Sequence, residues 1–293
     1  MIFRKKPQTQ KNQTKTTINE LCRLGTQLLD ESGRENAGFD ARCLIEKVLG
    51  TDTAGYMLRR SEFADTSLYN AYLGLIRRRA TGEPLQYILG RWAFMDSEFF
   101  VGEGVLIPRP ETELLVEFAA DFLKGKKKPV VFDLCSGSGC IAVSVAKLFP
   151  EAQIYAVEKY DEAFSFLKKN IELNGVENVT AVQGDIFNEA VLSAEPDLIL
   201  SNPPYIRTDE IPLLQQEVRR EPVTALDGGK DGYIFYDALA RLWLPKLKKG
   251  GAMAVECGEE QADEISQMFF LARSSVDIIN DLSGFPRVVT AVK

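Results

Sequence analysis

The sequence lacks histidine: none of its 293 residues carries an imidazole. Such a chain has no histidine base for serine or cysteine hydrolysis, no His-ligated zinc site and no histidine switch near neutral pH. Cysteine is scarce too, and the five that are present never form the C-x-x-C spacing of zinc knuckles or redox dithiols. The sequence therefore predicts reduced, mostly buried thiols and no metal site.

Long apolar runs and an excess of basic charge are also missing. No run approaches the roughly 20 apolar residues that span a bilayer, and no charged leader precedes an apolar stretch. The 35 basic and 42 acidic side chains give a net charge of −7. This acidity argues against binding nucleic acid over a broad surface, because neutralising phosphates supplies most of that affinity. Together these absences predict a cytoplasmic enzyme without membrane contact or direct nucleic-acid binding.

The length suggests about two domains, at roughly 150 residues each. Residues 1–16 are predicted to form a disordered polar tail, because they contain no acidic residue and little apolar surface. Residues 17–82 predict a small helical domain, because apolar side chains recur there at helical spacing. Residues 83–110, with aromatic and β-branched residues between glycines, predict a connector of one or two hairpins. The helical spacing is carried by Leu21, Leu24, Leu28, Leu68, Tyr72, Leu75 and Ile76.

Within residues 111–293, short apolar strands alternate with amphipathic helices. Repeated strand-then-helix units predict an α/β fold with a doubly wound, mainly parallel sheet. In such a sheet, ligands bind at the carboxyl ends of the strands, near the point at which the strand order reverses. The chemistry is therefore expected in the turns after the strands. The strands located by this pattern are 130–134, 154–157, 179–183, 198–200 and 252–255.

A glycine-rich turn follows the first of these strands and opens a helix. It reads Asp-Leu-Cys-Ser-Gly-Ser-Gly-Cys-Ile-Ala over residues 133–142. Gly137 and Gly139 let the backbone approach a ligand and expose the amides of a helix N-terminus. Glu158 ends the next strand, where a carboxylate can accept hydrogen bonds from both ribose hydroxyls. These residues predict a nucleoside site without identifying the nucleoside.

The spacing Gly137-x-Gly139-x-x-Ala142 also fits a dinucleotide fingerprint, so a nicotinamide-dependent oxidoreductase is an alternative. Asp133 lies four residues before the first glycine. Its charge would repel a pyrophosphate but suits a cationic amino-acid group, such as the methionine part of S-adenosylmethionine. This charge favours the methyl donor over the dinucleotide.

The turn after the third strand reads Gly184-Asp185-Ile186-Phe187. Asp185 can accept a hydrogen bond from the amino group of adenine, while Ile186 or Phe187 covers the ring. Asp is also a preferred helix cap, so Asp185 has an alternative role that only shapes the backbone. The two roles are compatible with each other.

The fourth strand ends in Ser201-Asn202-Pro203-Pro204-Tyr205, the most informative segment of the chain. Its two prolines fix φ and remove two donors, which leaves nearby carbonyls free to face a ligand. The side-chain oxygen of Asn202 and the carbonyl of Pro203 can together accept both hydrogens of a planar NH2 group. The ring of Tyr205 offers a face to a flat amide or base. The alternative is a proline-stiffened turn without chemistry.

Two further segments have more than one interpretation. The prolines of Pro108-Arg109-Pro110-Glu111-Thr112-Glu113 would stiffen the entry into a helix, which Thr112 or Glu111 could cap. This segment either joins the domains rigidly or contacts the substrate. The loop 227–232, Asp-Gly-Gly-Lys-Asp-Gly, matches neither a P-loop nor an EF-hand. It is interpreted as a flexible rim of the site.

In these motifs the sequence resembles the class I S-adenosylmethionine-dependent methyltransferases, and among them the N5-glutamine methyltransferases of peptide chain release factors. The resemblance extends from about Gly82 to the end of the chain. Residues 105–113 and 221–229 are more specific than the glycine-rich turn, whereas Asn-Pro-Pro-Tyr alone is shared with adenine N6-methyltransferases. The segments that carry the resemblance are Gly82-Glu-Pro-Leu-Gln-Tyr-Ile, Val105-Leu-Ile-Pro-Arg-Pro-Glu-Thr-Glu, 133–142, 201–206 and Glu221-Pro-Val-Thr-Ala-Leu-Asp-Gly-Gly.

The resemblance implies methyl transfer from S-adenosylmethionine to the side-chain amide nitrogen of a glutamine, in the Gly-Gly-Gln motif of release factors. It implies a seven-stranded class I sheet in a catalytic domain over residues 111–293, and a helical domain over 17–82 that helps to recognise the release factor. The oligomeric state is left open.

The resemblance also implies roles for individual residues. The turn from Cys135 to Gly139 would hold the methionine part of the donor, Glu158 the ribose, and Asp185 with Ile186 the adenine. The implied donor-binding residues are Asp133, Cys135, Ser136, Gly137, Ser138, Gly139, Glu158, Asp185, Ile186 and Asn202. The implied catalytic residues are Asn202, Pro203 and Tyr205, and the implied substrate-binding residues are Asn202, Pro203, Pro204 and Tyr205.

Three alternatives remain at this stage. The first is the same chemistry on a ribosomal-protein glutamine or on an adenine amino group in nucleic acid. The second is the nicotinamide-dependent oxidoreductase. The third is a catalytically silent module that docks on a translation factor, although such a module has no need of Asn-Pro-Pro-Tyr.

Overall fold

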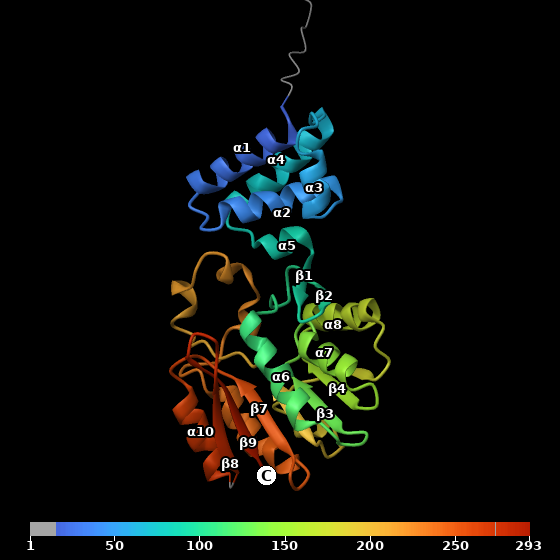
Figure 1. The fold of residues 1–293 in the computed structure, drawn as a ribbon. Coiled ribbons are helices and arrows are strands. Elements are labelled where there is room, and N and C mark those ends of the chain that lie inside the picture. The colour runs from blue at the N-terminus through green and yellow to red at the C-terminus, as the bar shows by residue number, and fades with distance from the viewer. Residues whose placement is uncertain (1–15, 273) are drawn as a thin grey trace, which may run out of the picture. The chain divides into compact units, whose positions relative to one another are not determined.

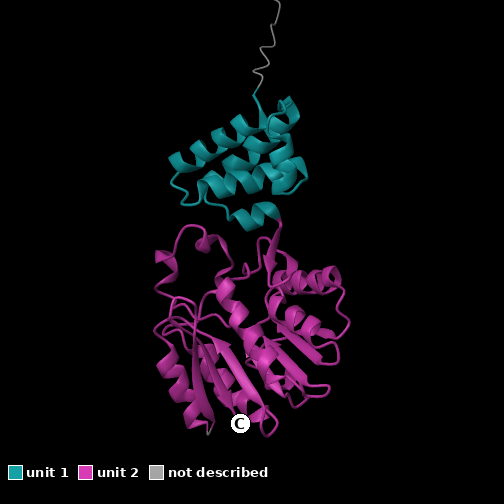
Figure 2. Cartoon of the chain, viewed as in Figure 1, with its two compact units in different colours: residues 1–89 teal, residues 90–293 magenta. Residues whose placement is uncertain are grey.

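The computed structural model describes residues 16–272 and 274–293. The chain divides into two compact units, one that ends at Leu89 and one that begins at Gly90 (Figure 2). The predicted polar tail, residues 1–16, lies outside the described residues except for Thr16.

The first unit consists of helices, as the apolar spacing predicted (Figure 1). A capping box begins the first helix: the Thr17 hydroxyl accepts a hydrogen bond from the Glu20 amide, and the Thr17 amide donates to the Glu20 carboxylate. Side chains from three helices are fully buried together, among them Leu21, Leu44 and Tyr72. The helices are α1 (Ile18–Glu31), α2 (Ala37–Leu49), α3 (Thr53–Arg59), α4 (Thr66–Ala80) and α5 (Leu85–Leu89).

Gly25 allows α1 and α4 to approach closely. A Cβ at this position would lie 2.0 Å from the Tyr72 hydroxyl oxygen and 2.9 Å from Ile76 Cδ1. The Tyr72 ring is fully buried, and its hydroxyl donates to the carbonyl of Ala41 at 3.2 Å. Because the Tyr72 ring is packed on all sides and its hydroxyl is hydrogen-bonded, a side chain at position 25 could displace it only at a substantial cost in free energy.

We expect Gly25→Ala to destabilise the helical unit by about 1–3 kcal/mol, the usual cost of overpacking a core. The higher helix propensity of alanine offsets this cost by at most ~1 kcal/mol. Hydrogen exchange of the α1 amides measures the loss. Gly38→Ala is the matched control, since its Cβ would meet only Thr26 Cγ2, at 4.0 Å. Equal protection in the two variants would contradict the packing argument.

The predicted connector, residues 83–110, contains one helix and one hairpin. Helix α5 covers residues 85–89, where an extended chain was expected. Strands β1 (Arg91–Phe94) and β2 (Ser97–Phe100) form the single antiparallel hairpin of this segment. Met95 in its turn has φ of 49°, and its amide donates to the Glu113 carboxylate at 2.7 Å. This bond ties the hairpin to the first residue of helix α6 (Glu113–Phe122).

The second unit contains the predicted mainly parallel seven-stranded sheet, in the order β5-β4-β3-β6-β7-β9-β8. The first five strands of this order run parallel, and β9 pairs antiparallel with both β7 and β8. The order reverses between β3 and β6, which is where a doubly wound sheet binds its ligand. The strands are β3 (Val130–Leu134), β4 (Gln153–Glu158), β5 (Val179–Gln183), β6 (Leu198–Ser201), β7 (Ala252–Glu256), β8 (Ser275–Asn280) and β9 (Pro286–Val292).

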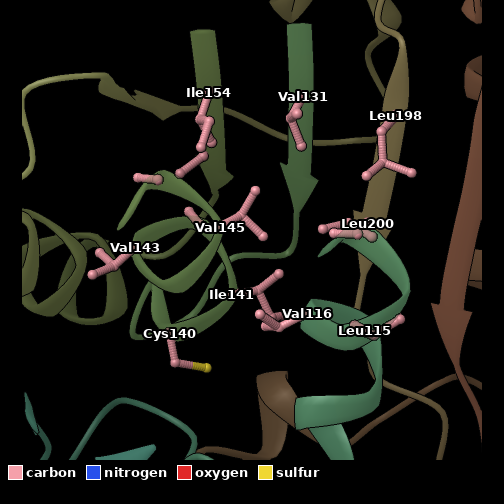
Figure 3. Packing of buried hydrophobic residues seen from close by; sticks show 14 of the residues in the cluster. Leu115, Val116, Val131, Cys140, Ile141, Val143, Val145, Ile154, Leu198 and Leu200 are labelled. Atoms are coloured by element: carbon pink, nitrogen blue, oxygen red, sulfur yellow. The ribbon is translucent and has the colours of Figure 1, made fainter. Parts of the chain in front are cut away.

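Helices cover both faces of this sheet. Alternate strand residues enter separate clusters. Val131 packs with Leu115 and Ile141 (Figure 3), whereas Phe132 packs with Trp243. The first cluster holds side chains of α6, α7 (Cys140–Leu148) and α8 (Asp161–Asn174). The second holds those of α9 (Ile234–Ala238), the π-helix η6 (Leu239–Trp243) and α10 (Ala262–Leu271). Short 3₁₀ helices occupy Pro110–Thr112, Glu189–Val191, Ile211–Leu213, Val218–Arg220, Val223–Ala225 and Leu244–Lys246.

All five cysteines carry free thiols, and three of them, Cys22, Cys140 and Cys257, are buried. This confirms the prediction of reduced and mostly buried cysteines. Within residues 16–272 and 274–293, no helix has both the length and the apolar character that crossing a membrane requires.

Candidate active site

A pocket of about 930 Å³, partly open to solvent, lies at the carboxyl ends of the parallel strands. Its wall includes the turns after β3, β4, β5 and β6, as expected for a doubly wound sheet. Nine of the predicted site residues line it: Cys135, Ser136, Gly137, Ser138, Glu158, Asp185, Ile186, Asn202 and Pro204.

Four predicted site residues do not line this pocket: Asp133, Gly139, Pro203 and Tyr205. Gly139 instead packs against helix α8, because a Cβ there would lie 2.4 Å from Leu167 Cδ1. Pro203 and Asp133 are buried, and Tyr205 is half-buried. Direct contact of these four residues with donor or substrate stays a prediction.

The turn after β3 has an unusual backbone. Cys135 and Gly137 have positive φ angles of 62° and 54°, and Cys135 is one of three non-glycine residues with positive φ among the described residues. The Ser136 amide donates to the carbonyl of Val157 at 2.9 Å, which fixes the turn to the neighbouring strand. Nothing lies within 4 Å of where a Gly137 Cβ would be. The turn therefore leaves open space beside its glycine.

Asp133 lies behind this turn with no exposed surface. Its Oδ2 accepts a hydrogen bond from the Ala142 amide at 3.1 Å, whereas its Oδ1 has no partner among the described residues. Burial raises the pKa of Asp133 to about 7, against the lowering effect of the Ala142 amide. An unpaired buried carboxylate oxygen is costly, so a donor group or a bridging water at this position would stabilise the turn.

Glu158 organises the backbone around the glycine turn through its two oxygens. Oε2 accepts a hydrogen bond from the Gly137 amide at 2.9 Å, and Oε1 accepts from the amides of Lys159 and Tyr160 at 2.8 and 2.9 Å. Burial raises the pKa of Glu158, and these three amides oppose the rise. Oε2 accepts only one of these bonds, so it keeps a lone pair that can accept a ribose hydroxyl. Glu158 thus holds the glycine turn, a function that the sequence did not reveal.

Asp185 is engaged with the protein itself. Its Oδ1 accepts a hydrogen bond from the Phe187 amide at 3.0 Å, and its Oδ2 pairs with Lys159 Nζ at 2.8 Å. Partial burial acts to raise the pKa of Asp185, but the Lys159 and Phe187 bonds hold it below the usual value. The helix cap considered for Asp185 is wrong, because Asp185 closes a tight turn and Asn188 caps the short helix that follows.

Aromatic side chains complete the wall beside Asp185. The rings of Phe187 and Phe235 are 5.2 Å apart, and both residues line the pocket. Ile186 is almost fully buried, and its carbonyl accepts a hydrogen bond from the indole of Trp243 at 2.8 Å. Phe187 and Phe235 therefore offer the more exposed apolar surface for a flat base.

Asn202 lines the pocket in the turn after β6. Its Nδ2 donates to the Thr112 hydroxyl at 3.1 Å, and the same hydroxyl donates to the Glu256 carboxylate at 2.6 Å. No donor among the described residues bonds to Asn202 Oδ1 or to the Pro203 carbonyl. Two acceptors are thus left free in the predicted NH2 clamp.

The structure corrects the cap predicted for α6. Thr112 forms no side-chain cap bond, because its hydroxyl contacts Glu256 and Asn202 instead. The segment 108–113 lies within the second unit, and Pro108, Arg109 and Thr112 line the pocket. Arg109 forms an ion pair with the buried Glu221, which also accepts a hydrogen bond from the Ile107 amide. These contacts favour the substrate-contact interpretation over the joint.

The loop 227–232 is not a flexible rim of the pocket, and that interpretation is wrong. None of its residues lines the pocket. Its backbone is hydrogen-bonded to the segment that follows Tyr205. The Gly228 amide donates to the carbonyl of Ile206 at 2.8 Å, and the Ile206 amide donates to that of Leu226 at 2.9 Å. This loop supports the acceptor turn from behind.

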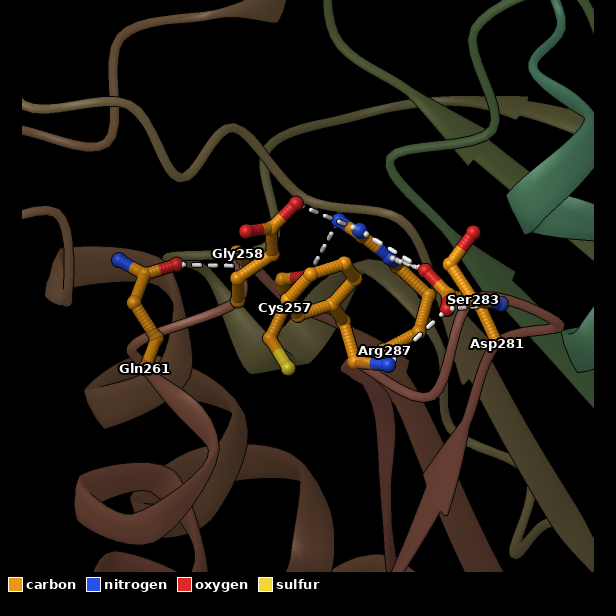
Figure 4. A network of polar contacts seen from close by, with 8 residues as sticks. Cys257, Gly258, Gln261, Asp281, Ser283 and Arg287 are labelled. Atoms are coloured by element: carbon orange, nitrogen blue, oxygen red, sulfur yellow. Dashed lines mark hydrogen bonds and ion pairs between the residues drawn. The ribbon is translucent and has the colours of Figure 1, made fainter.

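Figure 4 shows a polar network in the segment after β7, and Gln261 of this network also contacts that turn. The Gln261 side chain accepts a hydrogen bond from the Gly258 amide at 3.0 Å and donates to the carbonyl of Tyr205 at 3.0 Å. Arg287 pairs with Asp281 and donates to the carbonyl of Cys257. These contacts fix the segment after β7 against the end of Asn-Pro-Pro-Tyr.

Sequence reasoning missed Glu256 and Phe235 as parts of this region. Glu256 ends a buried strand, and an acidic residue at that position is the one signal that could have identified it. Phe235 lies in a short helix whose pattern marks no site. The sequence predicted only a helix-capping role for Thr112.

The comparisons with known proteins agree with this geometry. Residues 20–90 match the PrmC N-terminal domain, and residues 110–230 match the Methyltransferase small domain. The release factor glutamine methyltransferase of Geobacter sulfurreducens is 41% identical over 86% of this chain and 88% of that protein. That of Clostridium botulinum is 34% identical over 94% of this chain and 99% of that protein. The chain belongs to the release factor glutamine methyltransferase family.

Membership of the release factor glutamine methyltransferase family confirms the resemblance, the class I fold and the choice of S-adenosylmethionine over a dinucleotide. Among solved structures, the hMettl16 catalytic domain in complex with MAT2A 3′UTR hairpin 1 has a TM-score of 0.54. It is 12% identical over 80% of this chain and 85% of that chain, and this similarity shows the fold alone.

The residues of the pocket, together with Asp133 behind its glycine turn, fit the donor of this family. The glycine turn leaves open space, Asp133 Oδ1 is buried without a partner, and Glu158 keeps acceptor capacity at the end of β4. Acceptors suit the ammonium and hydroxyl groups of S-adenosylmethionine, and the aromatic pair suits its adenine. The assignment of each residue to a part of the donor remains a prediction.

We expect Glu158→Gln to weaken donor binding about 10- to 100-fold, because one side-chain oxygen replaces two charged acceptors. Hydrogen bonds to charged groups contribute about 1.5–3 kcal/mol, and each 1.4 kcal/mol is roughly tenfold in affinity. Calorimetry with S-adenosylmethionine measures the change. The exposed Glu151→Gln is the matched control. Unchanged affinity in Glu158→Gln would refute the assignment to the donor site.

Proposed function

We propose that this chain transfers a methyl group from S-adenosylmethionine to the side-chain amide nitrogen of a glutamine in peptide chain release factors. The observation that carries the proposal is the free pair of acceptors in the turn after β6: Asn202 Oδ1, whose residue lines the pocket, and the adjacent Pro203 carbonyl. Two acceptors match the two hydrogens of a primary amide.

The chain's own residues orient the acceptor rather than activate it with a base. S-adenosylmethionine, when bound, supplies a methyl group that is already activated on a sulfonium. An amide nitrogen is a poor nucleophile, so alignment carries most of the catalysis, and orientation can contribute roughly 7–11 kcal/mol. Asn202 Oδ1 and the Pro203 carbonyl accept the NH2 hydrogens and stabilise the positive charge that develops on nitrogen. The extra proton leaves to water after transfer.

The names of the relatives support a release factor as the protein substrate. The helical unit matches the PrmC N-terminal domain, and we propose that it helps to recognise that factor. We propose the cytoplasm as the compartment, since release factors act there with ribosomes and all five thiols are free. No observation favours an adenine amino group or a ribosomal protein as the acceptor.

The test is methyl transfer from labelled S-adenosylmethionine to three purified acceptors: a release factor, a ribosomal-protein mixture and adenine-containing nucleic acid. We expect label in the release factor only, located by mass spectrometry on the glutamine of its Gly-Gly-Gln motif. A release factor with that glutamine replaced by alanine is the control and should take no label. Label confined to nucleic acid or ribosomal protein would overturn the proposal.

A further inference from the structure

Three side chains from separate parts of the sequence form one hydrogen-bonded chain beside the pocket. Asn202 follows β6, Thr112 precedes α6, and Glu256 ends β7. Asn202 Nδ2 lies 3.1 Å from the Thr112 hydroxyl oxygen, which lies 2.6 Å from Glu256 Oε2. Thr112 and Glu256 are each 2% exposed, so water does not compete for these bonds.

The number of protons shared by these three side chains determines which end of the Asn202 amide faces Thr112. The Thr112 hydroxyl has one hydrogen. When Glu256 is ionised it can only accept, so the hydroxyl must donate to it and turns its lone pairs to Asn202. A lone pair attracts the NH2 end of the amide. The oxygen of Asn202 then faces the pocket, where it can accept a hydrogen from a substrate NH2 group.

Protonation of Glu256 would remove this constraint and permit the opposite direction. A neutral carboxyl can donate to Thr112, and the hydroxyl can then donate to the oxygen of Asn202. The NH2 end of Asn202 would face the pocket, where it cannot accept a hydrogen bond from another NH2 group. The orientation of a single amide thus separates a competent clamp from an incompetent one.

We propose that Thr112 and ionised Glu256 are positioning residues that hold Asn202 with its oxygen toward the acceptor nitrogen. This inference rests on the proposed function, because it concerns the same amide acceptor. Neither residue need touch the reacting atoms, and Glu256 is not part of the pocket wall.

The surroundings of Glu256 determine when it ionises. Burial raises its pKa to about 7, opposed by the Thr112 hydroxyl, Arg287 and Asn202. Glu111 adds to the rise. The other titratable groups that face Glu256 are Tyr205, Tyr236, Cys140 and Cys257, whose own pKa values are all raised and which are neutral near pH 7. Methyl transfer should therefore increase as the pH rises through about 7.

The first test is a matched pair at position 112, compared by kcat at saturating S-adenosylmethionine and saturating release factor. Thr112→Val keeps the shape and removes the hydroxyl, and we expect kcat to fall at least tenfold. Thr112→Ser keeps the hydroxyl and removes a methyl group, and we expect most of kcat to be retained. If Thr112 acts only by packing, Thr112→Val should retain more of kcat than Thr112→Ser. That result would overturn the proposal.

The second test asks whether Thr112 acts through Asn202. In an Asn202→Ala background there is no amide to orient, so Thr112→Val should reduce single-turnover methyl transfer by less than twofold. A further tenfold loss in the double variant would overturn the proposal. Calorimetric donor affinity should be the same in Thr112→Val and the parent, and thermal unfolding checks that each variant is folded.

The third test uses Glu256→Gln, which has no carboxyl group to titrate. We expect the rise of kcat between pH 6 and 8 to disappear, and its persistence would overturn the role of Glu256. Burial also raises the pKa of Asp133 to about 7, so donor saturation is verified at each pH to separate the two groups. Failure of the parent protein to methylate glutamine refutes the proposed function, whereas a normal parent with an active Thr112→Val refutes this inference.

Discussion

Asn202→Ala should lower the rate of methyl transfer about 100- to 1000-fold while S-adenosylmethionine still binds. The size of this decrease in rate follows from the cost of removing one hydrogen-bonding group from a site that stabilises developing charge. Asn202 supplies one of the two free acceptors of the clamp, and the loss leaves the amide nitrogen held on one side only. Single-turnover kinetics with a release factor and calorimetry with the donor, on one preparation, measure both quantities.

The fold should survive this substitution. The Asn202 amide donates to Thr112, and after its removal the Thr112 hydroxyl still donates to Glu256. No buried donor is therefore left without a partner. Asn70→Ala, on the exposed side of α4, is the matched control and should leave methyl transfer unchanged. Near-normal turnover in Asn202→Ala, or lost donor binding in a folded protein, would remove Asn202 from the role assigned to it.

The parallel half of the fold could be predicted from the sequence because its signals are local. Apolar strands at 130–134 and 198–200 are followed by turns that carry glycine or proline, and the structure has strands there. The last two strands could not be located in this way. β9 lies between β7 and β8 and pairs antiparallel with both. That order depends on long-range contacts rather than on any periodic pattern in the segments themselves.

The donor side of the site was also predictable, since Gly137 and Glu158 lie at strand ends whose place in the sheet is fixed by topology. The hydrogen bonds that link Asn202, Thr112 and Glu256 were not predictable. Thr112 is 90 residues from Asn202 and 144 residues from Glu256 along the sequence. Thr112 has a local role open to it as a helix cap. A buried carboxylate at hydrogen-bond distance competes for the same hydroxyl, and only the tertiary structure decides between them.

The glycines of the loop 227–232 suggested flexibility, but Gly228 instead allows this loop to pack closely against Tyr205. A Cβ at this position would lie 2.7 Å from the Cα and 2.8 Å from the carbonyl carbon of Tyr205. Both atoms belong to the backbone, so neither can swing away as the end of a side chain would. The absence of a side chain at position 228 therefore sets how closely the loop supports the acceptor turn.

Gly228→Ala should consequently reduce methyl transfer about 100-fold without a matching loss of donor affinity. The new Cβ must push the Tyr205 backbone, and with it the clamp at Asn202, and a misplacement of about 1 Å at a reacting centre can cost 10²-fold. The donor turn at Gly137 belongs to a different strand and is held by Glu158, so donor binding should persist. Single-turnover transfer and donor calorimetry measure the two effects.

The control for this variant is Gly74→Ala in α4, where nothing lies within 4 Å of the added Cβ. Alanine is favoured over glycine within a helix by roughly 0.8–1 kcal/mol, so this control should be fully active and no less stable. Position 228 has no positive φ, so backbone strain cannot explain a loss there. If Gly228→Ala transfers methyl groups at the parent rate, the close packing of Gly228 does not determine where the acceptor clamp lies.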